Sequence, residues 1–138
     1  MKGSILTFIG ILGSAFSFYV GGLDQLVITL CIVITVDYIS GATVAVVFKS
    51  SPKTENGKAS SIVGFKGICK KLFILLLVGV ANSLDRVLGT AFIRDGLIFA
   101  LLANETLSII ENAGLMGIPI PTIMKNAVEL LNQKGDTK

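Results

Sequence analysis

Long stretches without charge dominate this sequence and limit what it can fold into. Residues 4–20 contain no charged side chain, and residues 25–48 contain a single one, Asp37. A soluble chain of 138 residues has too small an interior to bury apolar runs of this length. A helix of roughly 20 apolar residues, however, crosses the hydrocarbon core of a bilayer. Lipid is therefore the expected solvent for much of the chain.

The composition agrees with a membrane protein. Charged residues make up 15% of the chain, whereas an ordinary soluble domain contains about 25%, and the mean hydropathy is +0.81. Most of the cations flank apolar runs, which is typical of membrane proteins. A nucleic-acid-binding protein would instead gather them on one basic face, so we expect no nucleic-acid partner.

Four membrane spans are predicted, at residues 4–20, 25–48, 70–92 and 96–113. Because lipid offers the backbone no hydrogen-bond partner, each span should be an α-helix. The third span is the weakest, since Asp85 and Arg86 interrupt it, and a three-span or re-entrant arrangement stays open. A secretory signal is the lesser alternative for the first span. We expect an all-α polytopic membrane protein with three to four transmembrane helices in a single domain over residues 1–138.

Lysines determine the expected orientation. Residues 49–71 are predicted to form a basic cytoplasmic loop, whose lysines are Lys49, Lys53, Lys58, Lys66, Lys70 and Lys71. Basic loops stay on the cytoplasmic side of a membrane. Four spans would then place both termini in the cytoplasm. The simplest role of this loop is to fix the topology and to bind anionic lipid headgroups.

A tail over residues 114–138 follows the last span. After Pro121, the side chains of Ile123, Ala127, Leu130 and Leu131 are expected on one face of a helix. This pattern predicts a short C-terminal amphipathic helix that lies in the membrane interface, with docking on a soluble partner less favoured.

Polar side chains inside the predicted spans are the candidate functional residues. Asp37 lies in the middle of the second span, where a carboxylate is costly enough that it should face a polar interface or a pore. Five polar residues of the fourth span fall within an arc of about 120° on a helix. They are Asn104, Glu105, Ser108, Glu111 and Asn112. Repeated by symmetry in an oligomer, this face would line a water-filled hole.

The same residues also permit a purely structural interpretation. Asp37 would then tie two helices together through a hydrogen bond, to Asn82 or to a hydroxyl group. Glu111 and Asn112 would be solvated at the cytoplasmic boundary, whereas Glu105 lies deeper in its span.

In a chain this short, we expect the buried acids to meet one another or water across subunits.

Small residues recur at intervals of four along three of the spans, a spacing that lets helix backbones approach closely in lipid. The predicted packing residues are Gly13, Ser17, Gly21, Gly41 and Gly79. This pattern favours a packed bundle or a homo-oligomer.

The sequence gives no sign of enzyme chemistry. It contains no histidine, no glycine-rich phosphate loop and no nucleophile with a neighbouring base. Cys31 and Cys69 do not have the spacing of a metal site and are not expected to pair. We therefore expect no catalytic residue, no metal and no cofactor.

Several motifs resemble the toxin-secretion/phage lysis holin family. They are Asp-Tyr-Ile-Ser-Gly at residues 37–41, residues 60–68 leading into Lys70 and Lys71, and residues 105–114 and 117–121. The resemblance implies a small protein of the bacterial cytoplasmic membrane that oligomerises, permeabilises the membrane and collapses the membrane potential. It also implies an endolysin, or in some members a large toxin, as the cargo that is released.

Two other classes of function stay open at this point. In a small ion-conducting channel or transporter, Asp37 and Glu105 would bind cations or protons, and flux would be selective and saturable. A non-pore antiholin or scaffold protein would instead be harmless on expression and would copurify with a partner.

Overall fold

A computed structural model describes residues 1–136, and over this range the backbone forms five α-helices and no β-strand. The helices are α1 (Lys2–Val20), α2 (Gln25–Thr43), α3 (Ser61–Leu88), α4 (Ile93–Leu115) and α5 (Thr122–Asp136). A π-helical turn, η1 (Val44–Phe48), prolongs α2. The expected all-α class is confirmed. Residues 137 and 138 of the predicted tail lie outside the described residues.

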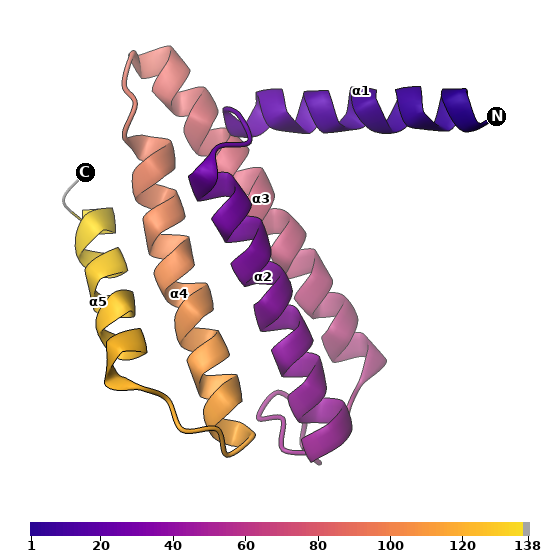
Figure 1. Cartoon of the computed structure of the whole chain (residues 1–138), viewed down its shortest axis with the longest axis vertical. Helices are drawn as coiled ribbons and strands as arrows, with labels where there is room; N and C mark the ends of the chain where they lie inside the picture. The colour runs from indigo at the N-terminus through magenta and orange to yellow at the C-terminus, as the bar shows by residue number, and fades with distance from the viewer. Residues whose placement is uncertain (137–138) are drawn as a thin grey trace.

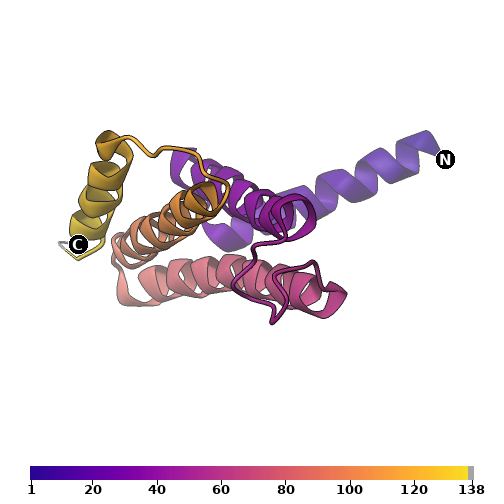
Figure 2. The ribbon, with the colours of Figure 1, turned by 90° about the horizontal axis from the view of Figure 1, so that it is seen from below.

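Three helices form the body of the molecule. α2, α3 and α4 run alongside one another (Figure 1), and a view from below shows them as the three sides of a bundle (Figure 2). The α1–α2 and α3–α4 turns lie at one end of this bundle, which we call the turn end. The connection at residues 49–60 lies at the opposite end, which we call the loop end. α5 folds back along α4, and α1 points away from the bundle.

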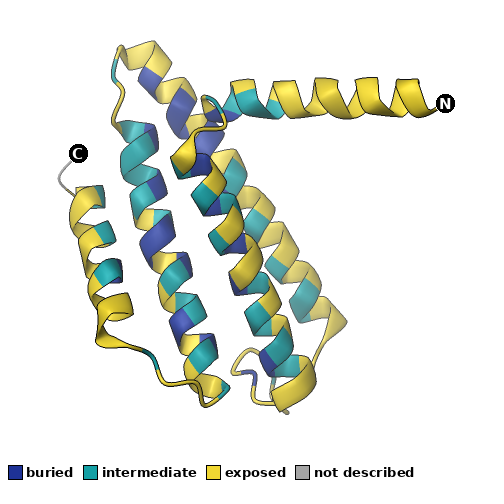
Figure 3. Ribbon diagram, viewed as in Figure 1, coloured by how far each residue is buried: buried dark blue, intermediate teal, exposed yellow. Residues whose placement is uncertain are grey.

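Two helical segments are long and apolar enough to cross a membrane, Lys2–Val20 and Gln25–Phe48. α1 is exposed along most of its length (Figure 3), and only its last turn is buried against the bundle. A continuous apolar surface of this kind is unfavourable in water but suits a lipid environment. The structure thus contains two helices that could span a membrane.

The apolar core of the bundle lies toward the turn end. Its buried residues come from the end of α1 and from α2, α3 and α4; they are Val20, Val27, Leu30, Ile34, Ile74, Val78, Ile98 and Leu102. A smaller cluster of Ala103, Ile110 and Val128 joins α4 to α5. In lipid, such contacts stabilise the bundle mainly through close packing, because the surrounding acyl chains are as apolar as the core.

The third helix begins earlier than the sequence predicted. α3 starts at Ser61, inside the segment that was expected to be a loop. Lys66, Lys70 and Lys71 therefore lie on this helix, and the loop itself is shorter. The prediction placed the helix start where the charges end, but a long lysine side chain is tolerated on the first turns of a helix if its ammonium group reaches a polar environment.

Asp85 does not interrupt the third helix. It lies in the last turn of α3, where its carboxylate accepts hydrogen bonds from the backbone N–H groups of Ile93 (3.1 Å) and Arg94 (2.9 Å). The Thr90 hydroxyl also donates to Asp85, at 2.5 Å. The carboxylate thus satisfies free N–H groups at the start of α4, as a capping side chain does. The acid expected to weaken the third span instead holds the α3–α4 turn together.

Gly79 brings α1 and α3 into contact. It is buried, and a Cβ atom at this position would collide with the ring of Tyr19. The Tyr19 hydroxyl donates a hydrogen bond to the carbonyl oxygen of Leu76 at 2.8 Å. The absent side chain therefore makes room for the aromatic ring that attaches α1 to the bundle.

The other predicted packing residues have varied surroundings. Gly21 ends α1 with a φ of 85°, which few residues with a side chain adopt. Gly41 faces the amide of Asn112, which a Cβ atom would approach to 3.7 Å. Ser17 is half-buried, and its carbonyl oxygen accepts the N–H of Gly22 at 2.7 Å. Gly13 has no neighbour within 4 Å, so its packing role stays a prediction about contacts with another copy.

The expected apolar face of the tail is only partly used. Val128 is buried, and Ala127 and Leu131 are half-buried, on the side of α5 that faces α4. Ile123 and Leu130, expected on that same face, are 74% and 60% exposed. α5 therefore packs on α4 through a face rotated from the predicted one.

Candidate functional site: a buried charge cluster between α2, α3 and α4

One lysine and two acids meet inside the bundle. Lys71 on α3 forms ion pairs with both Asp37 on α2 and Glu105 on α4. The side chains of Asp37 and Glu105 are 5% and 2% exposed, and that of Lys71 is 14% exposed. The charge cluster, as we call these three residues, thus connects all three helices of the bundle.

The ion pairs explain how two carboxylates can be buried in this bundle. An unpaired carboxylate at the centre of a membrane span costs about 2.5–3.5 kcal/mol on insertion scales. An ammonium group between two carboxylates offsets much of this cost, because opposite charges attract strongly where water is excluded. With one cation for two anions, the charge cluster keeps one formal negative charge.

Asn112 extends the charge cluster toward the loop end. Its Nδ2 atom donates to the Ser40 hydroxyl at 2.8 Å and to the Asp37 carboxylate at 3.3 Å. Asn112 is buried, so it is not solvated at a membrane boundary, as one interpretation of the sequence proposed. It instead links the C-terminal part of α4 to α2.

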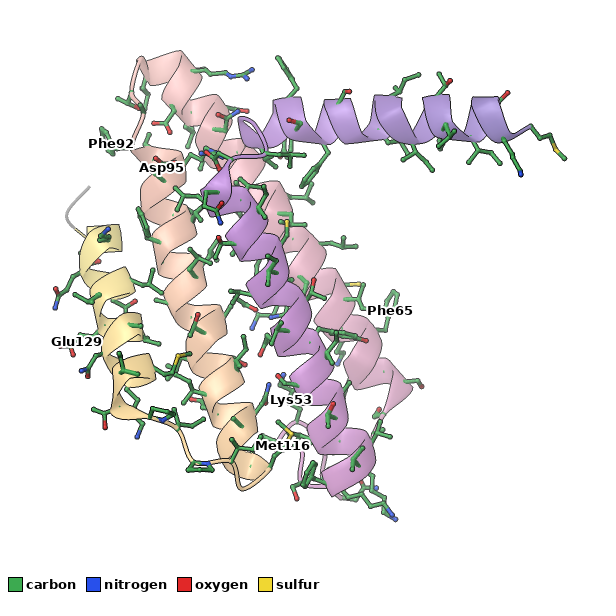
Figure 4. All side chains as sticks on the ribbon, viewed as in Figure 1. Lys53, Phe65, Phe92, Asp95, Met116 and Glu129 are labelled. Atoms are coloured by element: carbon green, nitrogen blue, oxygen red, sulfur yellow. The ribbon has the colours of Figure 1, made fainter. Side chains whose placement is uncertain are left out.

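A cavity adjoins the charge cluster. Its volume is about 840 Å³, and it is bounded by α2, the 49–60 connection, α3 and α4. Lys53, Lys66 and Lys70 contribute further charge to its walls. Figure 4 shows Lys53 at the loop end, between α2 and α4. The cavity therefore combines a negative charge cluster with a mainly basic rim.

The six polar residues singled out from the sequence come together around this cavity. All of them line it: Asp37, Asn104, Glu105, Ser108, Glu111 and Asn112. They differ in burial, since Asp37, Glu105 and Asn112 are buried whereas Asn104 and Glu111 are exposed. Their role in a pore or a polar interface stays a prediction.

The way in which the acids are satisfied differs from the expectation. Asp37 and Glu105 meet Lys71 of the same chain, rather than one another or water across subunits. Asn82, considered as a partner of Asp37, instead donates to the carbonyl oxygen of Tyr19 at 3.1 Å. The most buried part of the predicted wet face of α4 is therefore covered within one chain.

Sequence reasoning missed the partner role of Lys71 because it assigned this residue to the loop. Its neighbour Lys70 is exposed, so the two adjacent lysines have different surroundings. The available signal was the presence of two acids within apolar spans. Buried acids need a cation at the same depth, and Lys71 directly precedes the apolar residues of α3.

A second polar cluster, also missed, lies at the turn end. Arg94 is buried, and its Nε atom donates to the carbonyl oxygen of Val20 at 2.6 Å. Its Nη1 atom donates to Asp24 at 2.8 Å and to Asp95 at 2.9 Å. Arg94 therefore attaches both the end of α1 and the start of α2 to α4.

This second cluster alters the acidity of Asp24. The hydrogen bond from Arg94 lowers the pKa of Asp24 from the ordinary value of 3.8. Asp24 also accepts the backbone N–H of Val27 at 3.1 Å, as the N-cap of α2. The charged form of Asp24 is thus stabilised by the fold.

No group of three or more His, Cys, Asp or Glu side chains within residues 1–136 is arranged to hold a metal ion. Cys31 and Cys69 are both free thiols.

Several known proteins are similar to this chain in sequence. The uncharacterized protein Lin0175 of Listeria innocua is 41% identical over 94% of this chain and 89% of its own length. The uncharacterized protein CPE0383 of Clostridium perfringens is 35% identical over 92% of this chain and 90% of its own length. A protein of Bacillus phage phi105, described as a probable holin, is 29% identical over 52% of this chain and 54% of its own.

No solved structure matches this chain. The family model described as the bacteriophage holin family matches residues 14–133. That match includes α2, α3 and α4 in full and therefore both polar clusters. The chain belongs to the bacteriophage holin family.

Proposed function

We propose that this protein is a phage-type holin, which oligomerises in the bacterial cytoplasmic membrane and permeabilises it. Permeabilisation would collapse the membrane potential and release an endolysin or a large toxin. The observation that carries the proposal is the family match over residues 14–133. The exposed apolar surfaces of α1 and α2 support it, because they suit a protein that is solvated by lipid.

The proposed topology has the loop end in the cytoplasm. Lys49, Lys53 and Lys58 belong to the 49–60 connection, and Lys66 and Lys70 lie on the first turns of α3. This concentration of lysines supports the cytoplasmic assignment through the positive-inside rule. The turn end would then face the outside.

The bundle supplies three of the proposed spans, α2, α3 and α4. α1 supplies the fourth after a rotation about Gly21 and Gly22, whose φ angles are 85° and 104°. With α1 across the membrane, the N-terminus and the C-terminal end of α4 both lie on the cytoplasmic side. This rotation has to break the contacts of the last turn of α1, those of Tyr19 with α3 and of Val20 with Arg94, whereas the earlier turns of α1 are exposed.

Assembly of several copies is part of the proposal. The cavity of a single bundle, about 840 Å³, is far smaller than a folded protein, so a hole must form between copies. The exposed apolar surface of α1, including the free side of Gly13, is available for helix–helix contacts in lipid.

An ion-coupled transporter receives less support from the geometry. The acids that would bind a cation, Asp37 and Glu105, are already paired with Lys71. A transported ion would have to displace an ammonium group that is covalently part of the protein.

Expression in bacteria with an endolysin that lacks its own export signal tests the proposed function. We expect abrupt depolarisation, reported by a potential-sensitive dye, followed by lysis. Cells that express only the endolysin serve as the control and should keep growing. Normal growth and potential, with the protein verified in the membrane fraction, would contradict the holin proposal.

A further inference from the structure

α5, which is 15 residues long, folds back alongside part of the 23-residue α4 (Figure 1). Near the middle, Val128 packs with Ala103 and Ile110. Farther along, a Cβ atom on Gly135 would lie 3.3 Å from the backbone nitrogen of Ala100 and 3.4 Å from the carbonyl oxygen of Gly96. If α4 crosses the membrane, as the proposed function assumes, α5 therefore lies at membrane depth, and its C-terminal end lies toward the turn end and not in the cytoplasm, where the four-span prediction placed it.

The side of α5 that faces away from α4 is polar. At roughly 100° per residue, seven polar positions fall within an arc of about 120°. All seven are exposed: Thr122, Lys125, Asn126, Glu129, Asn132, Gln133 and Asp136. Figure 4 shows Glu129 pointing away from α4. We call this arc the outer face of α5.

Lipid is a poor solvent for the outer face. Charged side chains within the hydrocarbon region are expensive, and they normally face a partner or water. The three charged residues of the outer face, Lys125, Glu129 and Asp136, have no other helix of this chain covering them. At membrane depth, the outer face must therefore meet water.

The buried polar side chains of α4 are not available to meet that water, and its exposed ones, Asn104 and Glu111, line the cavity inside the bundle. Glu105 is held by Lys71, and Asn112 by Asp37 and Ser40. A second surface of α4, around Ala103 and Ile110, is covered by α5. Of the helices that pack around α4, α5 is the one that presents a continuous polar arc away from the bundle.

We propose that α5 is the helix that lines the water-filled hole of the assembled holin. Its inner face, around Val128, stays on α4, and its outer face meets the water between copies. This inference rests on the proposed holin function. Ile123 and Leu130, which are exposed beside the outer face, contact the neighbouring copy.

The charges of the outer face suit an unselective hole. Lys125 is four residues from Glu129 and therefore adjacent to it on the helix surface. The mixture of both signs keeps the lining from favouring cations or anions strongly, which fits a passage for large folded cargo.

A covalent lock tests the position of α5. The starting chain carries Cys31→Ser and Cys69→Ser and therefore has no cysteine of its own. Into it are introduced Ala100→Cys on α4 and Gly135→Cys on α5. Their two Cβ atoms would lie 3.5 Å apart, which is within the range for a disulfide. The purified chain is placed in phosphatidylethanolamine/phosphatidylglycerol vesicles that hold a fluorescent dye. Copper phenanthroline then oxidises the two thiols to the disulfide.

We expect the disulfide to form and the locked protein to release dye as fast as the reduced protein. The two single-cysteine variants, oxidised in the same way, are the controls. Failure of the disulfide to form would overturn the inference, as would loss of dye release on oxidation alone. If the cysteine-free parent releases no dye, the proposed function itself fails, and the two failures are thereby distinguished.

A second experiment tests whether the outer face meets water. Asn126→Leu with Glu129→Leu makes this face apolar, and we expect dye release to slow by roughly tenfold or more, because an apolar lining no longer stabilises water. The matched control is Glu55→Leu with Asn56→Leu, an exposed pair in the 49–60 connection, which should leave release unchanged. Equal release by both variants would overturn the inference.

Discussion

Lys71 joins the three helices of the bundle through a single side chain. Its ammonium group pairs with one carboxylate on α2 and another on α4, so its removal affects two acids at once. Removing one partner of a buried ion pair usually costs about 3–5 kcal/mol, because an uncompensated charge stays behind. The exposed neighbour Lys70 has no such role and offers a natural comparison.

We therefore expect Lys71→Met to lower the free energy of unfolding by about 3–5 kcal/mol. Denaturant titration in detergent micelles, followed by circular dichroism, measures the change. Lys70→Met is the control and should change stability by less than about 0.5 kcal/mol. Adding Asp37→Asn and Glu105→Gln to Lys71→Met should restore much of the lost free energy of unfolding, because no unpaired charge then stays behind. A triple variant as unstable as Lys71→Met alone would contradict the ion-pair explanation.

Asp24 gives a prediction about pH. Its pKa is lowered in the folded protein, chiefly by the hydrogen bond from Arg94. A lowered folded pKa contributes stability above the unfolded value, and that contribution disappears as the pH falls through the folded pKa. At neutral pH, the Asp24–Arg94 pair therefore contributes fully to stability.

The comparison of the parent with Asp24→Asn isolates this contribution, because asparagine is also a good N-cap but carries no charge. We expect the parent to have the higher melting temperature near pH 6. The difference should shrink as the pH falls below 3.8, the ordinary pKa of aspartate. A difference that stays constant between pH 6 and pH 2 would show that the ion pair does not carry the effect.

Among the elements, α3 differs most from what its sequence suggests. It carries exposed lysines in its first turns, the buried Lys71, the buried Gly79 and the capping carboxylate Asp85. Each lies on a different stretch of one continuous helix. α3 therefore connects the charge cluster, the attachment of α1 and the turn that leads into α4.

Gly79→Ala should weaken the attachment of α1 to α3. The added methyl group would meet the Tyr19 ring, and overpacking of this kind typically costs about 1–3 kcal/mol. Unfolding in detergent measures the loss. The control is Gly13→Ala, on the exposed part of α1, where nothing lies within 4 Å of the added methyl group. This change should leave the stability of the monomer unchanged. Equal effects of the two substitutions would contradict the packing role of Gly79.

At the scale of the whole molecule, the sequence predicted the helices well and their mutual contacts less well. The uncharged runs are long, so they indicated helices over most of the observed ranges, and helical periodicity grouped Glu105 with Asn112. The ion pairs of Lys71 depend on how far α3 extends toward the loop end. The sequence did not indicate this extension of α3, because lysines next to an apolar run are also typical of the end of a membrane span.

The roles of Asp85 and Arg94 were hidden for a different reason. Both form their contacts across chain turns, with groups such as the carbonyl oxygen of Val20 and the N–H of Ile93. Backbone partners of this kind have no side-chain signature in the sequence. Only the folded path of the α1–α2 and α3–α4 turns reveals them.

The uneven distribution of contacts along the bundle has a mechanical consequence. Arg94 and most of the apolar core tie the helices together near the α1–α2 and α3–α4 turns. Toward the other extremity, the same helices are separated by about 840 Å³ of open space. Beyond the contacts that Lys71 and Asn112 make, we therefore expect the helices to separate more readily near the 49–60 connection than near the two turns.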